Sequence, residues 1–278
     1  MSECFGILNI TADSFSDGGD FLSSNQANQK ALGLLQSGAD WIEVSGQSSN
    51  VSAFLVEETE EWHRISSVLP LLKKEKAKIS IDSFRPSVQK LALEYGVGCL
   101  NDISGFTHVD SKRVLQEDLM KHKTVALLVM HSHTLGIAKQ NSNLTPSNVI
   151  AKIKAFFWDR KKELMDWGIQ EHRIYFDPGM GFFLSDDPEV SFAVLRNIDS
   201  LLSEFPNLMV SVSRKSFLGN SVGGIPASER EFVTLAVEMY LLQKKVPWIR
   251  THNVLKVKQA EKILRKLDLL STRSDGLP

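Results

Sequence analysis

The stretch Met209-Val-Ser-Val-Ser-Arg-Lys-Ser-Phe-Leu-Gly219 decides the architecture that we expect for this chain of 278 residues. It begins as a buried strand and continues without a break into Ser213-Arg-Lys-Ser216. Because side chains alternate along a strand, Ser211, Ser213 and Lys215 would share one face. A cation at the end of an apolar strand is costly inside a core but stable at its mouth. The stretch therefore predicts a cavity at the end of this strand, with acceptor groups that face Lys215.

Strand-like runs alternate with helical patterns along the whole chain. The runs are Phe5–Ile10, Trp41–Val44, Lys78–Asp82, Cys99–Ile103, Val125–Met130, Arg173–Asp177, Leu208–Ser213 and Trp248–His252. One helix is expected over Glu57–Lys74 with a bend at Pro70, and another over Ser147–Trp167, begun by Thr145-Pro146. Strands that alternate with helices predict parallel pairing, and eight such units predict an α/β fold, a single (β/α)8 TIM barrel.

The length of the chain and its lack of a linker sequence predict the domain organisation. A chain of this length suggests roughly two domains, but single α/β barrels also reach it. No linker rich in proline, glycine or serine divides the chain. We therefore expect one barrel domain over residues 1–271 and a disordered tail over residues 272–278.

The composition limits the kinds of molecule that we expect the protein to bind and the cellular compartment in which we expect it. Thirty-two basic and 33 acidic side chains give a formal charge of −1, which provides no field for nucleic acid or an anionic membrane. The longest apolar run, Val125–Met130, is too short to span a bilayer, and we expect no signal peptide, since no charged segment followed by an apolar one precedes the first predicted strand. Cys4 and Cys99 are expected to be reduced. We therefore expect a cytoplasmic protein that binds small molecules, and neither nucleic acid nor membrane.

Most of the predicted strands finish on a polar residue, although barrel interiors are normally filled by Val, Ile and Leu. These residues are Asn9, Glu43 or Ser45, Asp82, Asn101, Asp177, Lys215, and Arg250 with His252. One such residue could cap a helix or meet water, but the whole set predicts a common site at the carboxyl ends of the strands. Two long connections, Thr11–Asn25 and Ser132–Thr145, leave the same end of the barrel.

These residue types point to a heterocycle that carries a phosphate. Two carboxylates, an asparagine and a lysine suit a flat ring with several hydrogen-bond donors and acceptors. Arg250 and His252, two residues apart on one strand, would form a cationic clamp for a phosphate or diphosphate. Asn9 offers a hard oxygen ligand, which could serve Mg²⁺ if a substrate phosphate supplies further ligands.

Six motifs carry a resemblance to the dihydropteroate synthases. They are Gly6-Ile-Leu-Asn-Ile-Thr-Ala-Asp-Ser-Phe-Ser-Asp-Gly-Gly19, Ile81-Asp-Ser83, Leu100-Asn-Asp-Ile-Ser-Gly105, Phe176-Asp-Pro-Gly-Met-Gly181, Ser213-Arg-Lys-Ser-Phe-Leu-Gly219 and Arg250-Thr-His252. The resemblance runs from Phe5 to about Lys266. It implies a transferase of folate synthesis that joins 6-hydroxymethyl-7,8-dihydropterin diphosphate to p-aminobenzoate and releases diphosphate. It also implies a homodimer and Mg²⁺ as the cofactor.

The resemblance assigns a role to each matching residue. Asp82, Asp177 and Lys215 would be catalytic, and the pterin ring would contact Asp82, Asn101, Asp177, Lys215, Met130 and Phe182. The diphosphate would contact Asn9, Ser49, Arg250 and His252, and Asn9 would also hold the metal. The p-aminobenzoate pocket would form from the loops around Thr11–Gly19 and Gln47–Ala53 and from the lysine-bearing motif, through Thr11, Asp13, Ser14, Phe15, Ser49, Asn50, Ser213 and Arg214.

The reaction that the resemblance implies suits the residues assigned to the site. Loss of diphosphate from a methylene carbon builds positive charge on the pterin, which Asp82 and Asp177 would face, and negative charge on the leaving group. We expect a dissociative step with no covalent nucleophile, from which the loops exclude water. Replacement of Asp177 by Asn should cut turnover steeply and leave the fold intact.

Departures from the family pattern gather on the aminobenzoate side. The second-loop motif reads Gly46-Gln-Ser-Ser-Asn-Val51, without the usual arginine and proline, and Phe182-Phe183-Leu184 follows strand six. Drift in an ordinary enzyme is one interpretation. The other is a pocket that admits p-aminobenzoate and excludes sulfonamides, since the changed motifs resemble those of the mobile sulfonamide-resistant group.

Two other functions remain open at this stage. One is a methyltransferase of the same superfamily that moves a methyl group from methyltetrahydrofolate to a corrinoid protein. The long loop after Asn9 and the Ser213–Gly219 motif disfavour it. The other is a pterin-binding subunit without turnover, which the complete set of diphosphate-side residues disfavours.

Overall fold

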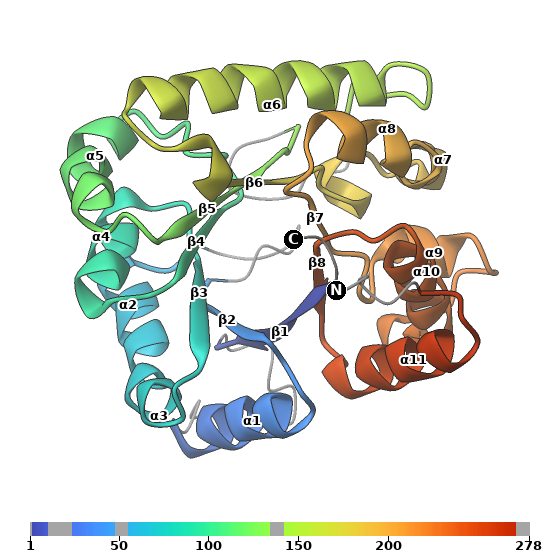
Figure 1. Cartoon of the computed structure of the whole chain (residues 1–278), viewed down its shortest axis with the longest axis horizontal. Coiled ribbons are helices and arrows are strands. Elements are labelled where there is room, and N and C mark those ends of the chain that lie inside the picture. Colours follow the sequence, from blue (N-terminus) through green and yellow to red (C-terminus); the bar gives the residue numbers. More distant parts are fainter. Residues whose placement is uncertain (1, 11–23, 48–54, 134–141, 271–278) are drawn as a thin grey trace, which may run out of the picture.

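The computed structural model describes residues 2–10, 24–47, 55–133 and 142–270, and its strands form one parallel sheet in the order β6-β5-β4-β3-β2-β1-β8-β7. The strands are β1 (Glu3–Asn9), β2 (Trp41–Ser45), β3 (Lys78–Asp82), β4 (Cys99–Asp102), β5 (Ala126–Met130), β6 (Ile174–Asp177), β7 (Met209–Val210) and β8 (Trp248–Thr251). Between β6 and β7 a single bridge, Phe176 to Leu208, brings the sheet almost to closure. The predicted TIM barrel is confirmed (Figure 1).

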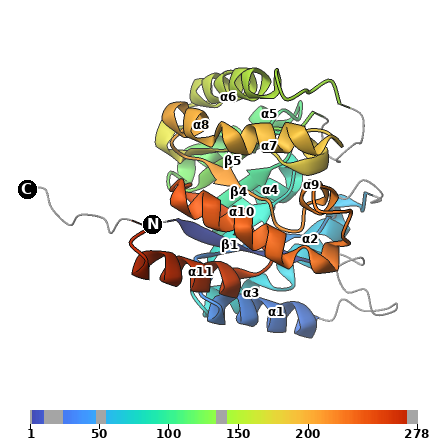
Figure 2. The ribbon, with the colours of Figure 1, turned by 90° about the vertical axis from the view of Figure 1, so that its right-hand side faces the viewer.

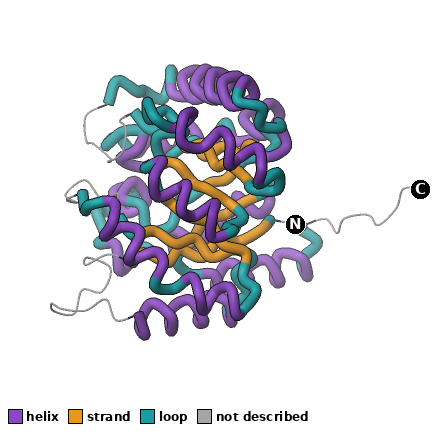
Figure 3. Tube along the Cα trace, turned by 90° about the vertical axis from the view of Figure 1, so that its left-hand side faces the viewer, coloured by secondary structure: helices purple, strands orange, loops and turns teal. Residues whose placement is uncertain are grey.

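Helices surround the barrel as an outer layer, with the strands inside (Figures 2 and 3). They are α1 (Ser24–Gln36), α2 (Glu58–Ser66), α3 (Leu69–Lys74), α4 (Pro86–Tyr95), α5 (Ser111–Lys121), α6 (Val149–Asp166), α7 (Pro188–Arg196), α8 (Ile198–Glu204), α9 (Ser216–Asn220), α10 (Glu231–Gln243) and α11 (Val254–Lys266). On α6 the apolar side chains of Ile153, Phe157 and Leu164 are buried. Burial of one such side chain contributes about 1.5–3 kcal/mol, so these stripes fix the helices against the sheet.

Aromatic side chains close the amino end of the barrel. Tyr175 and Trp248 stack with their ring centroids 3.5 Å apart, and Phe5 stacks on Trp41 at 5.1 Å. The carboxylate of Glu3 accepts hydrogen bonds from the indole N–H groups of Trp41 (3.2 Å) and Trp248 (2.9 Å). These rings form the floor of the barrel. Because they fill its amino end, the interior can hold a ligand only at the carboxyl end.

Proline and asparagine set two helix boundaries differently from the prediction. The expected bend within Glu57–Lys74 is an interruption, because Pro70 lies in the first turn of the new helix α3, where its missing N–H costs nothing. Helix α6 begins at Val149 with Asn148 as its N-cap, rather than at Thr145-Pro146. Asn148 accepts a hydrogen bond from the Thr145 N–H (2.8 Å), which holds the preceding residues in a turn.

Strand β7 is shorter than the predicted Leu208–Ser213. Its ladder ends at Val210, and Arg214 has a positive φ of 59°, which no strand can accommodate. Lys215 is therefore the residue before helix α9 and not the end of a strand, although it still reaches the interior as predicted.

Two further sequence predictions can be compared with the structure. Cys4 and Cys99 are buried and not joined in a disulfide, as predicted. Within the described ranges, no helix combines the length and apolar character needed to cross a membrane.

Candidate active site

A pocket opens at the carboxyl end of the barrel, with a volume of about 350 Å³ including its mouth. Its walls come from β3 to β6, β8 and the loops that follow, through Asp82, Asn101, Ile103, Met130, Asp177, Gly179, Met180, Phe183, Ser211, Lys215 and Arg250. Five residues that the sequence assigns to the pterin ring thus line one cavity: Asp82, Asn101, Met130, Asp177 and Lys215.

Glu43 organises the base of this pocket. Its carboxylate is 1% exposed, forms an ion pair with Arg250, and accepts hydrogen bonds from Asn101 Nδ2 (3.0 Å) and Ser80 Oγ (3.3 Å). Arg250 also donates to Asp82 Oδ2 at 2.9 Å. The sequence offered Glu43 only as an alternative to Ser45 and gave it no role. Glu43 shares a strand face with Trp41 of the barrel floor, and this is the signal that could have placed it inside.

Arg250 therefore lies deeper than its predicted role implies. The sequence placed it on the diphosphate, but in the structure its guanidinium lies within the ring pocket, between the carboxylates of Glu43 and Asp82. Its Cα is paired in register with that of Phe5 on the barrel floor, whereas His252 lies two residues farther toward the mouth.

Burial favours the uncharged forms of the ionisable side chains in the pocket. It raises the pKa of Asp82 to about 7, which Arg250 opposes and Glu43 increases. Burial also raises the pKa of Asp177 to about 6, against the N–H of Gly179 and the charge of Lys215. The pKa of Lys215 falls to about 8, because burial and Arg250 outweigh the two aspartates. The pocket can therefore exchange protons near pH 7.

Asp177 and Asn101 present oriented acceptors to the cavity. The Gly179 N–H donates to Asp177 Oδ1 at 2.8 Å, and Gly179 has a positive φ of 69°. A Cβ at Gly179 would lie 2.3 Å from the carbonyl oxygen of His131, so glycine is required at this turn. Asn101 Oδ1 is buried and lacks a hydrogen-bond partner among the described residues. Such an acceptor is costly unless a ligand donates to it.

Phe183, and not the predicted Phe182, forms the aromatic wall. Its ring centroid lies 4.4 Å from Lys215 Nζ, and it packs with Ile103 and Met130. Phe182 is partly buried and packs against this cluster without lining the cavity. The resemblance assigned Phe182 to the ring, whereas in the structure Gly181–Phe183 is a 3-10 turn from which Phe183 lines the cavity.

The rim of the pocket is cationic around His252. Ser213 Oγ lies 2.9 Å from His252 Nδ1. Burial, together with the nearby cations Arg250, Arg214, Lys30 and Lys215, lowers the pKa of His252 to about 3. The imidazole is therefore neutral, and the surrounding charge favours an anion. Lys30 of α1 is a member of this set that the sequence patterns did not indicate.

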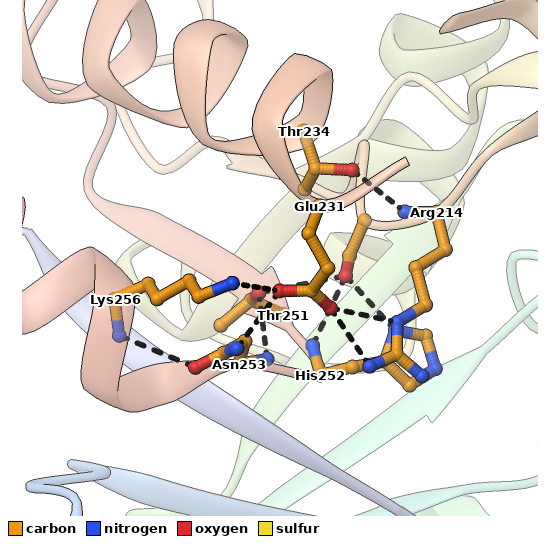
Figure 4. Close-up of polar contacts among 8 residues, drawn as sticks. Arg214, Glu231, Thr234, Thr251, His252, Asn253 and Lys256 are labelled. Atoms are coloured by element: carbon orange, nitrogen blue, oxygen red, sulfur yellow. Dashed lines mark hydrogen bonds and ion pairs between the residues drawn. The ribbon is translucent and has the colours of Figure 1, made fainter. Parts of the chain in front are cut away.

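Arg214, whose role the sequence left open, is held by α10 (Figure 4). Its guanidinium donates to Glu231 at 2.8 and 3.2 Å, and its N–H donates to Thr234 Oγ1 at 3.1 Å. Glu231 also accepts from Asn253 (2.8 Å) and Lys256 (2.9 Å). Burial alone would raise the pKa of Glu231, but these donors lower it to about 2. The ionised carboxylate fixes Arg214 beside His252.

The remaining predicted residues lie at or beyond the edge of the described chain. Thr11, Asp13, Ser14, Phe15, Ser49 and Asn50 lie outside the described residues. Asn9, the last residue of β1, is in register with Ser45 at the mouth. No group of three or more His, Cys, Asp or Glu side chains within the described ranges could hold a metal alone. The amide oxygen of Asn9 fits a Mg²⁺ ion whose other ligands come from a substrate phosphate.

Comparison with known proteins agrees with this geometry. Residues 5–252 match the family described as pterin binding enzyme. The chain is 39% identical over 268 residues to an Escherichia coli protein named dihydropteroate synthase type-3, which covers 96% of this chain and 100% of that protein. The chain belongs to the dihydropteroate synthase family. As a dihydropteroate synthase it is a transferase, and the family predicted from the six motifs is confirmed.

Further matches extend this result. The dihydropteroate synthase type-2 of Escherichia coli is 40% identical over 253 residues, which are 89% of each chain. A solved dihydropteroate synthase from Anaplasma phagocytophilum, with bound 6-hydroxymethylpterin-monophosphate, has a TM-score of 0.82 and 28% identity. That structure covers 96% of this chain and 99% of its own chain. Similarity to dihydropteroate synthases thus extends over the whole barrel.

Proposed function

We propose that this dihydropteroate synthase binds its pterin substrate in the pocket between Asp177, Asn101 and Lys215. The buried Oδ1 of Asn101, which has no hydrogen-bond partner in the part of the chain that the structure describes, carries the proposal, because a pterin offers N–H groups to such an acceptor. The carboxylate of Asp177 is oriented for further N–H groups, and Lys215 can donate to a ring carbonyl. Phe183 and Met130 would cover the ring with apolar surface.

The reaction would use the charges already present in the pocket. The bond between the methylene carbon and the diphosphate oxygen breaks, and its electron pair leaves with the diphosphate. The amine nitrogen of p-aminobenzoate then bonds to that carbon and loses a proton. Asp177 and Asp82 face the developing positive charge, while the cations around His252 face the leaving group.

Magnesium would assist departure of the diphosphate. When bound, the ion would neutralise negative charge on the leaving oxygens. Asn9 is the proposed protein ligand, and His252 with Arg214 and Lys30 would hold the phosphates that complete the coordination. Arg250 would reach the phosphates only by leaving its pairing with Glu43 or Asp82.

We further propose that the enzyme is insensitive to sulfonamides, works in the cytoplasm and forms a homodimer. The similarity to proteins named type-2 and type-3 supports insensitivity, as do the changed motifs near the aminobenzoate side. Phe183 belongs to one of these motifs and lines the pocket. Inhibition by sulfamethoxazole at concentrations near the KM for p-aminobenzoate would refute this part of the proposal.

One assay distinguishes the proposed reaction from its rivals. Diphosphate should be released from the pterin substrate only when p-aminobenzoate and Mg²⁺ are both present. A methyltransferase would release none, and neither would a binding subunit without turnover. Binding of the pterin without release would therefore overturn the proposed reaction.

A further inference from the structure

The segment that follows β5 is hydrogen-bonded to the segment that follows β6 at the carboxyl end of the barrel. The two strands are neighbours in the sheet, and their register pairs Met130 with Asp177. Beyond this pair, the backbone N–H of His131 donates to the carbonyl oxygen of Asp177 at 2.8 Å. The backbone N–H of His133 donates to the carbonyl oxygen of Phe183 at 3.0 Å. Backbone hydrogen bonds therefore join the two segments as far as the aromatic wall of the pocket.

The side chain of His133 adds a hydrogen bond to the same segment. Its Nε2 lies 3.0 Å from the carbonyl oxygen of Phe182. Because a carbonyl oxygen can only accept, Nε2 carries a proton and donates it. His133 thus binds two successive carbonyl oxygens of the Gly181–Phe183 turn, one through its backbone and one through its ring. The proposed reaction gives His133 no task.

Contacts from outside the Gly181–Phe183 turn fix its orientation, because such a short 3-10 segment forms few hydrogen bonds of its own. At its start, the Gly181 N–H donates to the buried hydroxyl of Ser191 on α7 at 2.9 Å. At its end lie the two carbonyl oxygens that His133 binds. The turn is therefore held from both sides, and His133 holds the end that carries Phe183.

The placement of this turn determines one wall of the pocket, because Phe183 projects from it. The ring of Phe183 is buried against Ile103 and Met130, and its centroid lies 4.4 Å from Lys215 Nζ. A rotation of the turn would move the ring away from the lysine and open the apolar wall. His133 itself is not among the described residues that line the pocket, so any effect on a ligand must pass through Phe183.

We propose that His133 is a positioning residue, whose ring donates to the Phe182 carbonyl oxygen and thereby holds the ring of Phe183 against the pterin. The proposal rests on the proposed function, which places the pterin beside Phe183. Loss of one hydrogen bond between neutral groups corresponds to roughly a two- to tenfold change in an equilibrium constant. Removal of the His133 ring should therefore weaken pterin binding within this range.

The test measures the Kd of the pterin diphosphate by calorimetry with Mg²⁺ and without p-aminobenzoate, so that no pteroate forms. His133→Ala keeps the backbone bond to Phe183 and loses the ring bond, so Kd should rise about fivefold. His133→Gln should bind like the wild type, because its amide N–H can reach the same carbonyl oxygen. His172→Ala is the matched control, since His172 is an exposed histidine just before β6, at the opposite end of the barrel. It should leave Kd unchanged.

A double variant separates a positioning role from direct contact with the ligand. Phe183→Ala should weaken binding by itself. Because His133 acts through Phe183, His133→Ala should cause no further loss in the Phe183→Ala background. A further loss of about fivefold in that background would overturn the proposal. So would a wild-type Kd in His133→Ala, or equal defects in His133→Ala and His133→Gln.

A third measurement requires no ligand. Met130 packs with Phe183, so the chemical shifts of its methyl group report the position of the aromatic ring. These shifts should move in His133→Ala and stay unchanged in His133→Gln and His172→Ala. If the wild type does not bind the pterin diphosphate, the proposed function fails, while the shifts still decide whether His133 holds Phe183. Unmoved shifts in His133→Ala would refute that role. Circular dichroism verifies that each variant is folded.

Discussion

Replacement of Asp177 by Asn removes one charge from the pocket and almost nothing else. Asp177 is 3% exposed, and its Oδ1 accepts the Gly179 N–H at 2.8 Å. The amide oxygen of Asn can accept the same bond, so the turn at Gly179 is retained. With a pKa of about 6, the wild-type carboxyl is mostly ionised at pH 7, and the variant loses this charge.

The expected loss of turnover follows from that charge. Removing one preorganised electrostatic group from a water-poor active site costs about 10²–10³ in kcat, or about 2.7–4 kcal/mol. The free energy of unfolding should change by about 1 kcal/mol or less, since the hydrogen bond persists and the cost of burying a charge disappears with it. The variant should therefore turn over about 10²–10³ times more slowly than wild type and remain well folded.

The assay is steady-state release of diphosphate, with urea unfolding as the measure of stability. Asp199→Asn is the control, because Asp199 is an exposed carboxylate of α8 that pairs with Lys244. It should leave kcat unchanged. Wild-type turnover in Asp177→Asn would refute the assignment of Asp177 to the reacting carbon.

The remaining predictions concern protonation and ion pairs. The specificity constant kcat/KM should rise as Asp177 and Asp82 ionise, near pH 6 and pH 7, and fall as Lys215 loses its proton near pH 8. In Lys215→Arg any residual activity should persist above pH 9, and an unmoved alkaline limb would exclude Lys215. Glu43→Gln should reduce the free energy of unfolding by about 3 kcal/mol, because Arg250 loses a buried partner, whereas a urea midpoint equal to wild type would contradict this. The lowered pKa of Glu231 contributes about 1 kcal/mol of stability that is present above pH 4.5 and lost toward pH 2, so thermal unfolding of Glu231→Gln should vary less over this range.

The inward-facing residues could be predicted because side chains alternate between the two faces of a β-strand. Asp82, Asn101 and Asp177 lie at the ends of strands with paired registers, so period-two alternation and the closure of the sheet bring them together. The alternation of strands and helices likewise predicted the barrel. These features depend on local pattern alone.

Other features of the site could not be predicted from the sequence, because they depend on contacts between distant segments or on irregular backbone. The role of Glu43 follows from its pairing with Arg250, 207 residues away. The choice of Phe183 over Phe182 depends on a 3-10 turn, and the reach of Lys215 depends on the left-handed backbone at Arg214. Period-two reasoning does not apply to either segment.

We propose above all that the cavity between Asp177, Asn101 and Lys215 holds the pterin ring. A crystal structure with the pterin diphosphate and Mg²⁺ tests it most directly. The ring should lie with an N–H group within hydrogen-bond distance of Asn101 Oδ1 and with the phosphates beside His252. A ring bound outside this cavity, with Asn101 Oδ1 still unpartnered, would contradict the account.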